Sequence, residues 1–148
     1  KTNNQVKDLQ LKNRVEKVNR QEAKINKIND DYIYFIENFY KDYIKEYNKS
    51  NATQNDINKI INKYCSKKFI EILKKSDIDF DPFINAQDVD LEILKSLEIT
   101  KDSSENNYFN VKYLDTYSGN KILIKIEIIE IESEFKINKI LVNGTMIG

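Results

Sequence analysis

Between Asp77 and Asp90 the chain reads Asp-Ile-Asp-Phe-Asp-Pro-Phe-Ile-Asn-Ala-Gln-Asp-Val-Asp. This stretch, here called the aspartate segment, contains the only proline of the chain, Pro82, and five aspartates. Because a proline ring disfavours the α-helical region for the residue before it, we expect Asp81 to lie in an extended or turn conformation. Apolar residues recur every three or four positions before the segment and every second position after it. The segment therefore predicts an α+β fold, in which helices precede an antiparallel sheet.

The half of the chain before the aspartate segment predicts several helices. Residues 6–29 form a polar leader, whose sparse apolar residues follow a heptad-like seam with Glu22 and Asn29 in the gaps. The seam continues into a stronger helix over residues 30–47, which carries a broad aromatic stripe. Residues 54–75 predict two short helices or one kinked helix, preceded by a capping pattern at Thr53.

The half after the segment predicts a curved antiparallel sheet of about four strands. Residues 91–100 are interpreted as a strand, and residues 108–117 alternate as a second one. A turn at Ser118-Gly119-Asn120 leads into a strand over 121–131, where the apolar pattern slips by one residue after Ile128 and predicts a β-bulge. A second tight turn at 132–134 leads into the last strand, over residues 135–142.

Composition excludes several classes of function. The chain has 24 basic and 24 acidic side chains, so no overall charge favours nucleic acid as a partner. The charge is uneven, because residues 1–29 carry eight basic and three acidic side chains and residues 77–105 carry two basic and nine acidic ones. There is no histidine, and Cys65 lies among apolar residues, so we expect a buried and inert thiol. No apolar run approaches the ~20 residues of a membrane helix.

Three groups of residues resemble a known family. They are Phe39-Tyr40…Tyr43, Tyr64…Phe69 and the run from Asp79 to Asp88 with its Asp-Pro-Phe…Ala-Gln-Asp signature. This pattern is similar to an NTF2-like bacterial family of unknown function, found mainly among envelope proteins and lipoproteins. The resemblance implies a cone-shaped α+β domain over residues 30–148 with a pocket between helices and sheet. It also implies a spacer over residues 1–29, a lipid anchor upstream of Lys1, and a periplasmic or outer-membrane location, with the cytoplasm as the alternative.

Six residues are candidates for binding a ligand or partner: Asp79, Asp81, Gln87, Asp88, Tyr64 and Tyr113. Clustered carboxylates also suit calcium, but the sixth position counted from Asp77 is Pro82 instead of Gly and the twelfth is Asp88 instead of Glu. The favoured interpretation is structural: aspartate side chains accept backbone N–H groups in turns, and Gln87 and Asp88 pin the segment to the sheet. Asp81 is expected to have a structural role too, in a turn that Pro82 already restricts. Neither a metal nor a cofactor is indicated.

The sequence favours a non-catalytic binding or interaction module of the bacterial envelope, with an unidentified protein or small ligand as its partner. One alternative is an immunity-type protein that blocks a toxin. Another is a small-molecule isomerase or dehydratase, in which Asp81 or Asp88 acts as a base beside Tyr64 or Tyr113. The leader helix further predicts a homodimer.

Overall fold

The computed structural model describes residues 2–148, and these divide into two compact units at Tyr32. The first unit extends to Tyr32 and the second comprises Ile33–Gly148. Helix α1, Thr2–Tyr47, contributes residues to both units. The sequence predicts that the domain begins at residue 30 and folds without residues 1–29. That boundary stays a prediction.

The first unit is a single stretch of α-helix. Residues 2–28 are all exposed, as predicted for a leader that does not complete the core, and the helix begins four residues earlier than expected, at Thr2. The exposed apolar side chains of this unit are Val6, Leu9, Leu11, Val15, Val18, Ile25 and Ile28.

The remainder of α1 and two short helices form the helical part of the second unit. Helix α2 spans Gln54–Tyr64 and α3 spans Lys67–Lys75, which confirms two helices over the predicted range. Thr53 and Ser66 cap them, each accepting the backbone N–H three residues later. Between the helices the chain adds to the edge of the sheet, because Cys65 bridges Ile137 and the Ser66 N–H donates to the Ile137 carbonyl at 2.9 Å. Cys65 is buried, and burial raises the pKa of its thiol.

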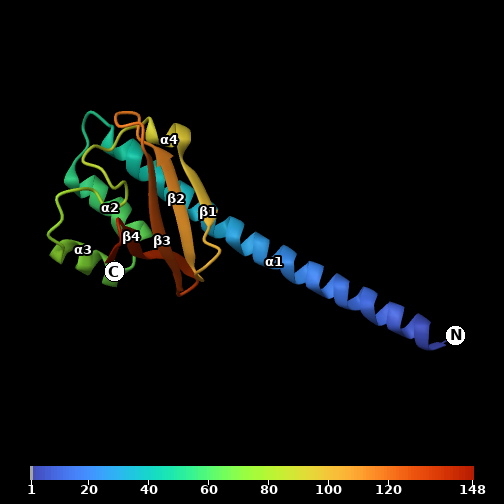
Figure 1. Ribbon diagram of the computed structural model, residues 1–148. Helices are drawn as coiled ribbons and strands as arrows, with labels where there is room; N and C mark the ends of the chain where they lie inside the picture. The colour runs from blue at the N-terminus through green and yellow to red at the C-terminus, as the bar shows by residue number, and fades with distance from the viewer. Residues whose placement is uncertain (1) are drawn as a thin grey trace. The chain divides into compact units, whose positions relative to one another are not determined.

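The sheet is a five-stranded antiparallel meander in the order β1-β2-β3-β4-β5 (Figure 1). Its strands are β1 (Glu98–Lys101), β2 (Tyr108–Leu114), β3 (Lys121–Ile131), β4 (Glu134–Val142) and β5 (Thr145–Ile147). Two expectations are therefore corrected. The predicted strand over 91–100 is a short helix, α4 (Ile93–Ser96), followed by β1, and a fifth strand follows the expected last one.

The predicted irregularity exists but its extra residue lies in the neighbouring strand. Register shifts between Glu127 and Ile128 of β3, and their partners in β4 are Lys139 and Ile137. Asn138 of β4 is therefore unmatched, and both Ile137 and Ile140 face the core. The bulge predicted within residues 121–131 is therefore wrong, because β3 keeps its alternation through Ile128 and Ile131 is exposed.

The core lies on one face of the sheet, where α2 and α3 contact β4 (Figure 1). Alternate residues of β2, β3 and β4 are buried there, while Lys112 and Leu123 of the intervening positions are exposed. Fully buried aromatic rings from α1, α3 and β2 fill the space with isoleucines of the sheet. The largest fully buried side chains are Tyr40, Phe39, Phe69, Phe109, Ile36, Ile44, Ile84, Ile124, Ile126, Ile128, Ile137 and Ile140.

Candidate functional site

The middle of the aspartate segment is a closed backbone turn. The Asp81 N–H donates to the Ala86 carbonyl at 2.9 Å, and the Asp81 carbonyl accepts the Asn85 N–H at 2.7 Å. Asn85 has a φ of 56°, a conformation that asparagine tolerates better than most residues. Pro82, with its fixed φ, supports the same turn. We call Asp81–Ala86 the inner turn.

The Asp81 carboxylate is used inside the protein. Its Oδ1 accepts the backbone N–H of Phe83 at 2.9 Å, and its Oδ2 accepts the hydroxyl of Tyr43 at 2.5 Å. Burial raises the pKa of Asp81 above its ordinary value, although the hydrogen bonds from Tyr43 and from the Phe83 and Ile84 backbone oppose this shift. The side chain therefore fixes the turn, as the structural interpretation predicted.

Three tyrosine hydroxyls hold the inner turn, and we call Tyr40, Tyr43 and Tyr113 the tyrosine clamp. Besides the Tyr43 bond to Asp81, Tyr40 donates to the Phe83 carbonyl at 2.7 Å. Tyr113 of β2 donates to the Ile84 carbonyl at 2.5 Å, and burial, with the nearby Asp115 and Asp81 charges, raises its pKa to about 12. The clamp thus satisfies polar groups that the turn buries against α1 and β2.

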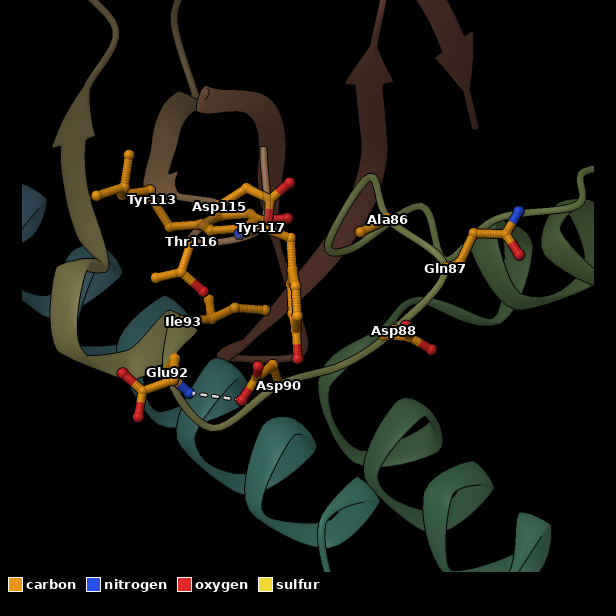
Figure 2. A pocket seen from close by; sticks show the side chains of 11 residues that line it. Ala86, Gln87, Asp88, Asp90, Glu92, Ile93, Tyr113, Asp115, Thr116 and Tyr117 are labelled. Carbon is orange, nitrogen blue, oxygen red and sulfur yellow. Dashed lines mark hydrogen bonds between the residues drawn. The ribbon is translucent and has the colours of Figure 1, made fainter. Parts of the chain in front are cut away.

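Two hollows border the aspartate segment. The aromatic cleft has a volume of about 530 Å³ and lies against the C-terminal end of α1, with Asp79, Asp81 and Gln87 among its walls. Its apolar walls include Tyr47, Ile78, Phe80, Pro82 and Val89. The acidic pocket has a volume of about 210 Å³ and lies between the end of the segment and the β2–β3 loop (Figure 2).

Four carboxylates line the acidic pocket and no basic side chain does: Asp88, Asp90, Glu92 and Asp115. Figure 2 shows Tyr117 along one wall, facing the Asp88–Asp90 side, and its side chain is 84% exposed. Ile93 and Tyr113 also line the pocket. The pocket therefore combines negative charge with an accessible aromatic ring.

The carboxylates of the pocket differ in how firmly local bonds hold them. Asp115 accepts the Ser118 hydroxyl at 2.6 Å and the Tyr117 N–H at 3.1 Å, and these hydrogen bonds lower its pKa. Asp90 accepts the Glu92 N–H at 3.0 Å, and Glu92 pairs with Lys95 at 2.9 Å. Within residues 2–148, the exposed Asp88 carboxylate makes no hydrogen bond or ion pair. It is the carboxylate most available to a partner.

The structure separates the six predicted site residues. Gln87 borders both hollows and its amide donates to the Asp79 carbonyl at 3.0 Å. Tyr64 lines neither hollow, because it packs against Phe35 and Phe39 and donates to Asp42 at 2.5 Å. Neither Tyr64 nor Tyr113 is hydrogen-bonded to Asp81 or Asp88, because Tyr64 donates to Asp42 and Tyr113 donates to the Ile84 carbonyl.

A structural role was expected for both Asp88 and Asp81. Asp81 makes the expected internal bonds, but Asp88 is exposed and does not pin the segment to the sheet. Tyr43, Asp115 and Tyr117 were not predicted as site residues. Tyr43 falls on the core stripe of α1, and only the fold shows that its hydroxyl meets Asp81. Asp115 and Tyr117 were expected in the strand over 108–117, but β2 ends at Leu114 and both residues lie in the loop between β2 and β3.

Neither a metal site nor a membrane span is found among the described residues. In residues 2–148, no group of three or more His, Cys, Asp or Glu side chains is arranged to hold a metal ion. No helix in that range is both long and apolar enough to cross a bilayer.

Comparison with known proteins shows a similar fold. No family model and no curated protein matches the sequence. A crystal structure of a protein of unknown function from Bacteroides thetaiotaomicron VPI-5482 matches with a TM-score of 0.74 and 22% sequence identity. The match covers 83% of this chain and 98% of that one. At this identity the likeness concerns the fold alone.

Proposed function

We propose that the protein is a non-catalytic binding module of the bacterial cell envelope, and that the acidic pocket receives a cationic group of its partner. The observation that carries this proposal is the set of four carboxylates that line the pocket, of which only Glu92 is paired with a basic side chain, Lys95. A lysine or arginine side chain entering it gains a carboxylate partner at Asp90 and an aromatic face at Tyr117, while the exposed Asp88 adds negative charge at the border of the pocket. The envelope location and the NTF2-like family rest on the resemblance of the Asp79–Asp88 signature.

An immunity-type protein is a special case of the same proposal. A toxin with a basic surface is a partner of the required chemistry, and matched charges mainly accelerate encounter and set specificity. The pocket is small and open, so we expect it to anchor one or two side chains within a larger contact.

The experiment uses a tetralysine peptide as the probe and follows the amide and ring signals of the protein by NMR during titration. We expect shifts concentrated at Asp88 and Tyr117, which weaken as salt is raised because exposed charges are screened. Asp88→Lys should abolish them. Asp77→Lys is the matched control, since Asp77 is an exposed aspartate of the same segment that lines neither hollow. Shifts that are equal in both variants, or spread over the whole surface, contradict the proposal.

The enzymatic alternative is favoured by one observation, the raised pKa of Asp81 beside the Tyr43 hydroxyl in the aromatic cleft. A general base needs a free oxygen within reach of the substrate proton. Both Asp81 oxygens accept internal hydrogen bonds, so the arrangement supports a structural role better than proton transfer. Turnover of a small carbonyl substrate by the wild type that is lost in Asp81→Asn, without loss of folding, would reverse this preference.

A further inference from the structure

The leader helix, the part of α1 in the first unit, carries an apolar seam that has no partner within residues 2–148. Leu11, Val15, Val18 and Ile25 occur at alternating spacings of three and four, with Glu22 among them, and the four apolar side chains are 50–62% exposed. The same spacing continues along α1 to buried Ile36, Phe39 and Tyr43. The first unit therefore presents the seam of a coiled coil to solvent.

Such a helix requires a packing partner. Helices in water owe most of their stability to the burial of one face and not to intrinsic propensity. Asparagine, a weak helix former, recurs along this stretch at Asn13, Asn19, Asn26 and Asn29. A seam of only two positions per heptad suits one facing helix, because a sheet or a membrane surface needs a wider apolar stripe.

We infer that the leader helix pairs with the leader helix of a second copy of this chain, in antiparallel orientation. Two leaders aligned so that Val18 of each copy faces Glu22 of the other also bring each Val15 opposite Ile25. Leu11 then faces Asn29. Every seam position from Leu11 to Asn29 thus faces a seam position of the second copy, Val15 and Ile25 form the apolar pairs, and the residues that overlap are 8–32.

Glu22 decides the orientation. In a parallel pair in register, the two Glu22 side chains occupy facing seam positions, and like charges at such positions oppose association. In the antiparallel alignment each Glu22 faces Val18 and the two carboxylates lie apart. Arg14, Gln21 and Ile28 lie beside the seam. In the antiparallel alignment, Gln21 lies opposite Gln21 of the second copy, so these positions make no like-charge contact.

The size of the contact predicts a reversible dimer. An overlap of 25 residues is about 37 Å long at 1.5 Å per residue and one helix diameter, ~10 Å, wide. It buries on the order of 800 Å² over both copies, below the ~1,200 Å² of a standard stable interface. Residues 1–29 carry eight basic and three acidic side chains in each copy, so the copies also repel at low salt. We therefore expect a monomer–dimer equilibrium in the micromolar range that salt strengthens.

Sedimentation of the full chain across a concentration series tests the pairing. Ile25→Lys should weaken dimerisation roughly a hundredfold, because the symmetric pair loses two buried isoleucines. Asn13→Lys adds the same charge on the helix face that points away from the seam and should change the dimerisation constant little. Glu22→Leu should strengthen dimerisation roughly tenfold. A wild type that stays monomeric up to several hundred micromolar at high salt overturns the inference. So does flotation of the monomer with phosphatidylglycerol vesicles that Ile25→Lys abolishes.

A short bismaleimide cross-linker tests the orientation. Single cysteines at Gln21→Cys face each other in the antiparallel pair and should link efficiently. Arg14→Cys places the two thiols 14 residues apart along the helix, about 21 Å, and should not link. The native Cys65 is buried and serves as an internal blank. Equal linking at both positions would show a parallel pair and overturn the proposed alignment.

Discussion

The inner turn Asp81–Ala86 and the stretch Gln87–Glu92 follow one another in the chain, and both carry acidic and amide side chains. In the inner turn the carboxylate of Asp81 accepts two internal hydrogen bonds, and three tyrosines satisfy the polar groups around it. In the following stretch, which we call the acidic rim, Asp88 is exposed and bonds to nothing within the described residues. The same residue type is a structural element at one position and a free surface charge seven residues later.

The difference teaches that acidity alone does not mark a binding site in this segment. What separates the two aspartates is their surroundings: Asp81 lies beside the hydroxyl of a buried helix residue, whereas Asp88 is exposed at the border of the pocket and points away from Tyr117 (Figure 2). Removing the first leaves donors without acceptors, and removing the second leaves nothing unpaired. The predictions below measure that difference.

The largest effect is expected for Asp81→Ala. It leaves the Phe83 N–H and the Tyr43 hydroxyl without their acceptor, and each such loss typically costs ~1–3 kcal/mol. We expect the free energy of unfolding to fall by about 2–4 kcal/mol in urea denaturation. Asp81→Asn keeps one acceptor oxygen and should cost much less.

Asp88→Ala is the matched control for this change. An exposed substitution away from packing and bonds typically changes stability by less than ~0.5 kcal/mol. Equal losses for Asp81→Ala and Asp88→Ala would remove the distinction between inner turn and acidic rim.

A smaller effect is expected for the tyrosine clamp. Tyr40→Phe retains the ring and removes only the donor to the buried Phe83 carbonyl, so we expect a loss of about 1–2 kcal/mol. Tyr117→Phe, at an 84% exposed side chain of the pocket, should be neutral in the same assay. A neutral Tyr40→Phe would mean that the turn does not depend on the clamp.

The smallest effect concerns pH. Burial raises the folded-state pKa of Asp81, so between the unfolded and folded values the folded state binds more protons. The contribution of Asp81 to the free energy of unfolding therefore falls as pH rises through its folded pKa. Urea denaturation at a series of pH values should show the wild type gaining stability relative to Asp81→Asn as pH is lowered from 7.

Asp102 should show the opposite dependence of stability on pH in the same series of denaturation experiments. The Ser104 N–H, the Lys125 ammonium at 3.0 Å and the Ser104 hydroxyl lower its pKa to about 2. Its contribution is present above the ordinary value and is lost as pH falls from about 4 to 2. Asp102→Asn should flatten the acid limb of the stability curve, and identical pH profiles for Asp81→Asn and Asp102→Asn would contradict both assignments.

Local signals in the sequence carried much of the fold. The change of apolar period at the aspartate segment predicted helices before strands, and Thr53 marked the start of α2 through its cap. A further local signal was available at Asn143-Gly144, a pair typical of two-residue hairpins, where both residues have positive φ and lead into β5.

The sequence by itself determined which residues turn, cap and alternate, because these properties depend on neighbours a few positions away. Only the tertiary structure decided that Tyr43 bonds Asp81, that Tyr64 bonds Asp42, and that the unmatched residue of the bulge is Asn138. Each of these contacts joins separate elements, and Tyr43 and Asp81 are 38 residues apart. The periodicity of apolar residues predicts which face of an element is buried. It does not predict which polar atom of another element a buried side chain will contact, because that depends on how the elements pack together.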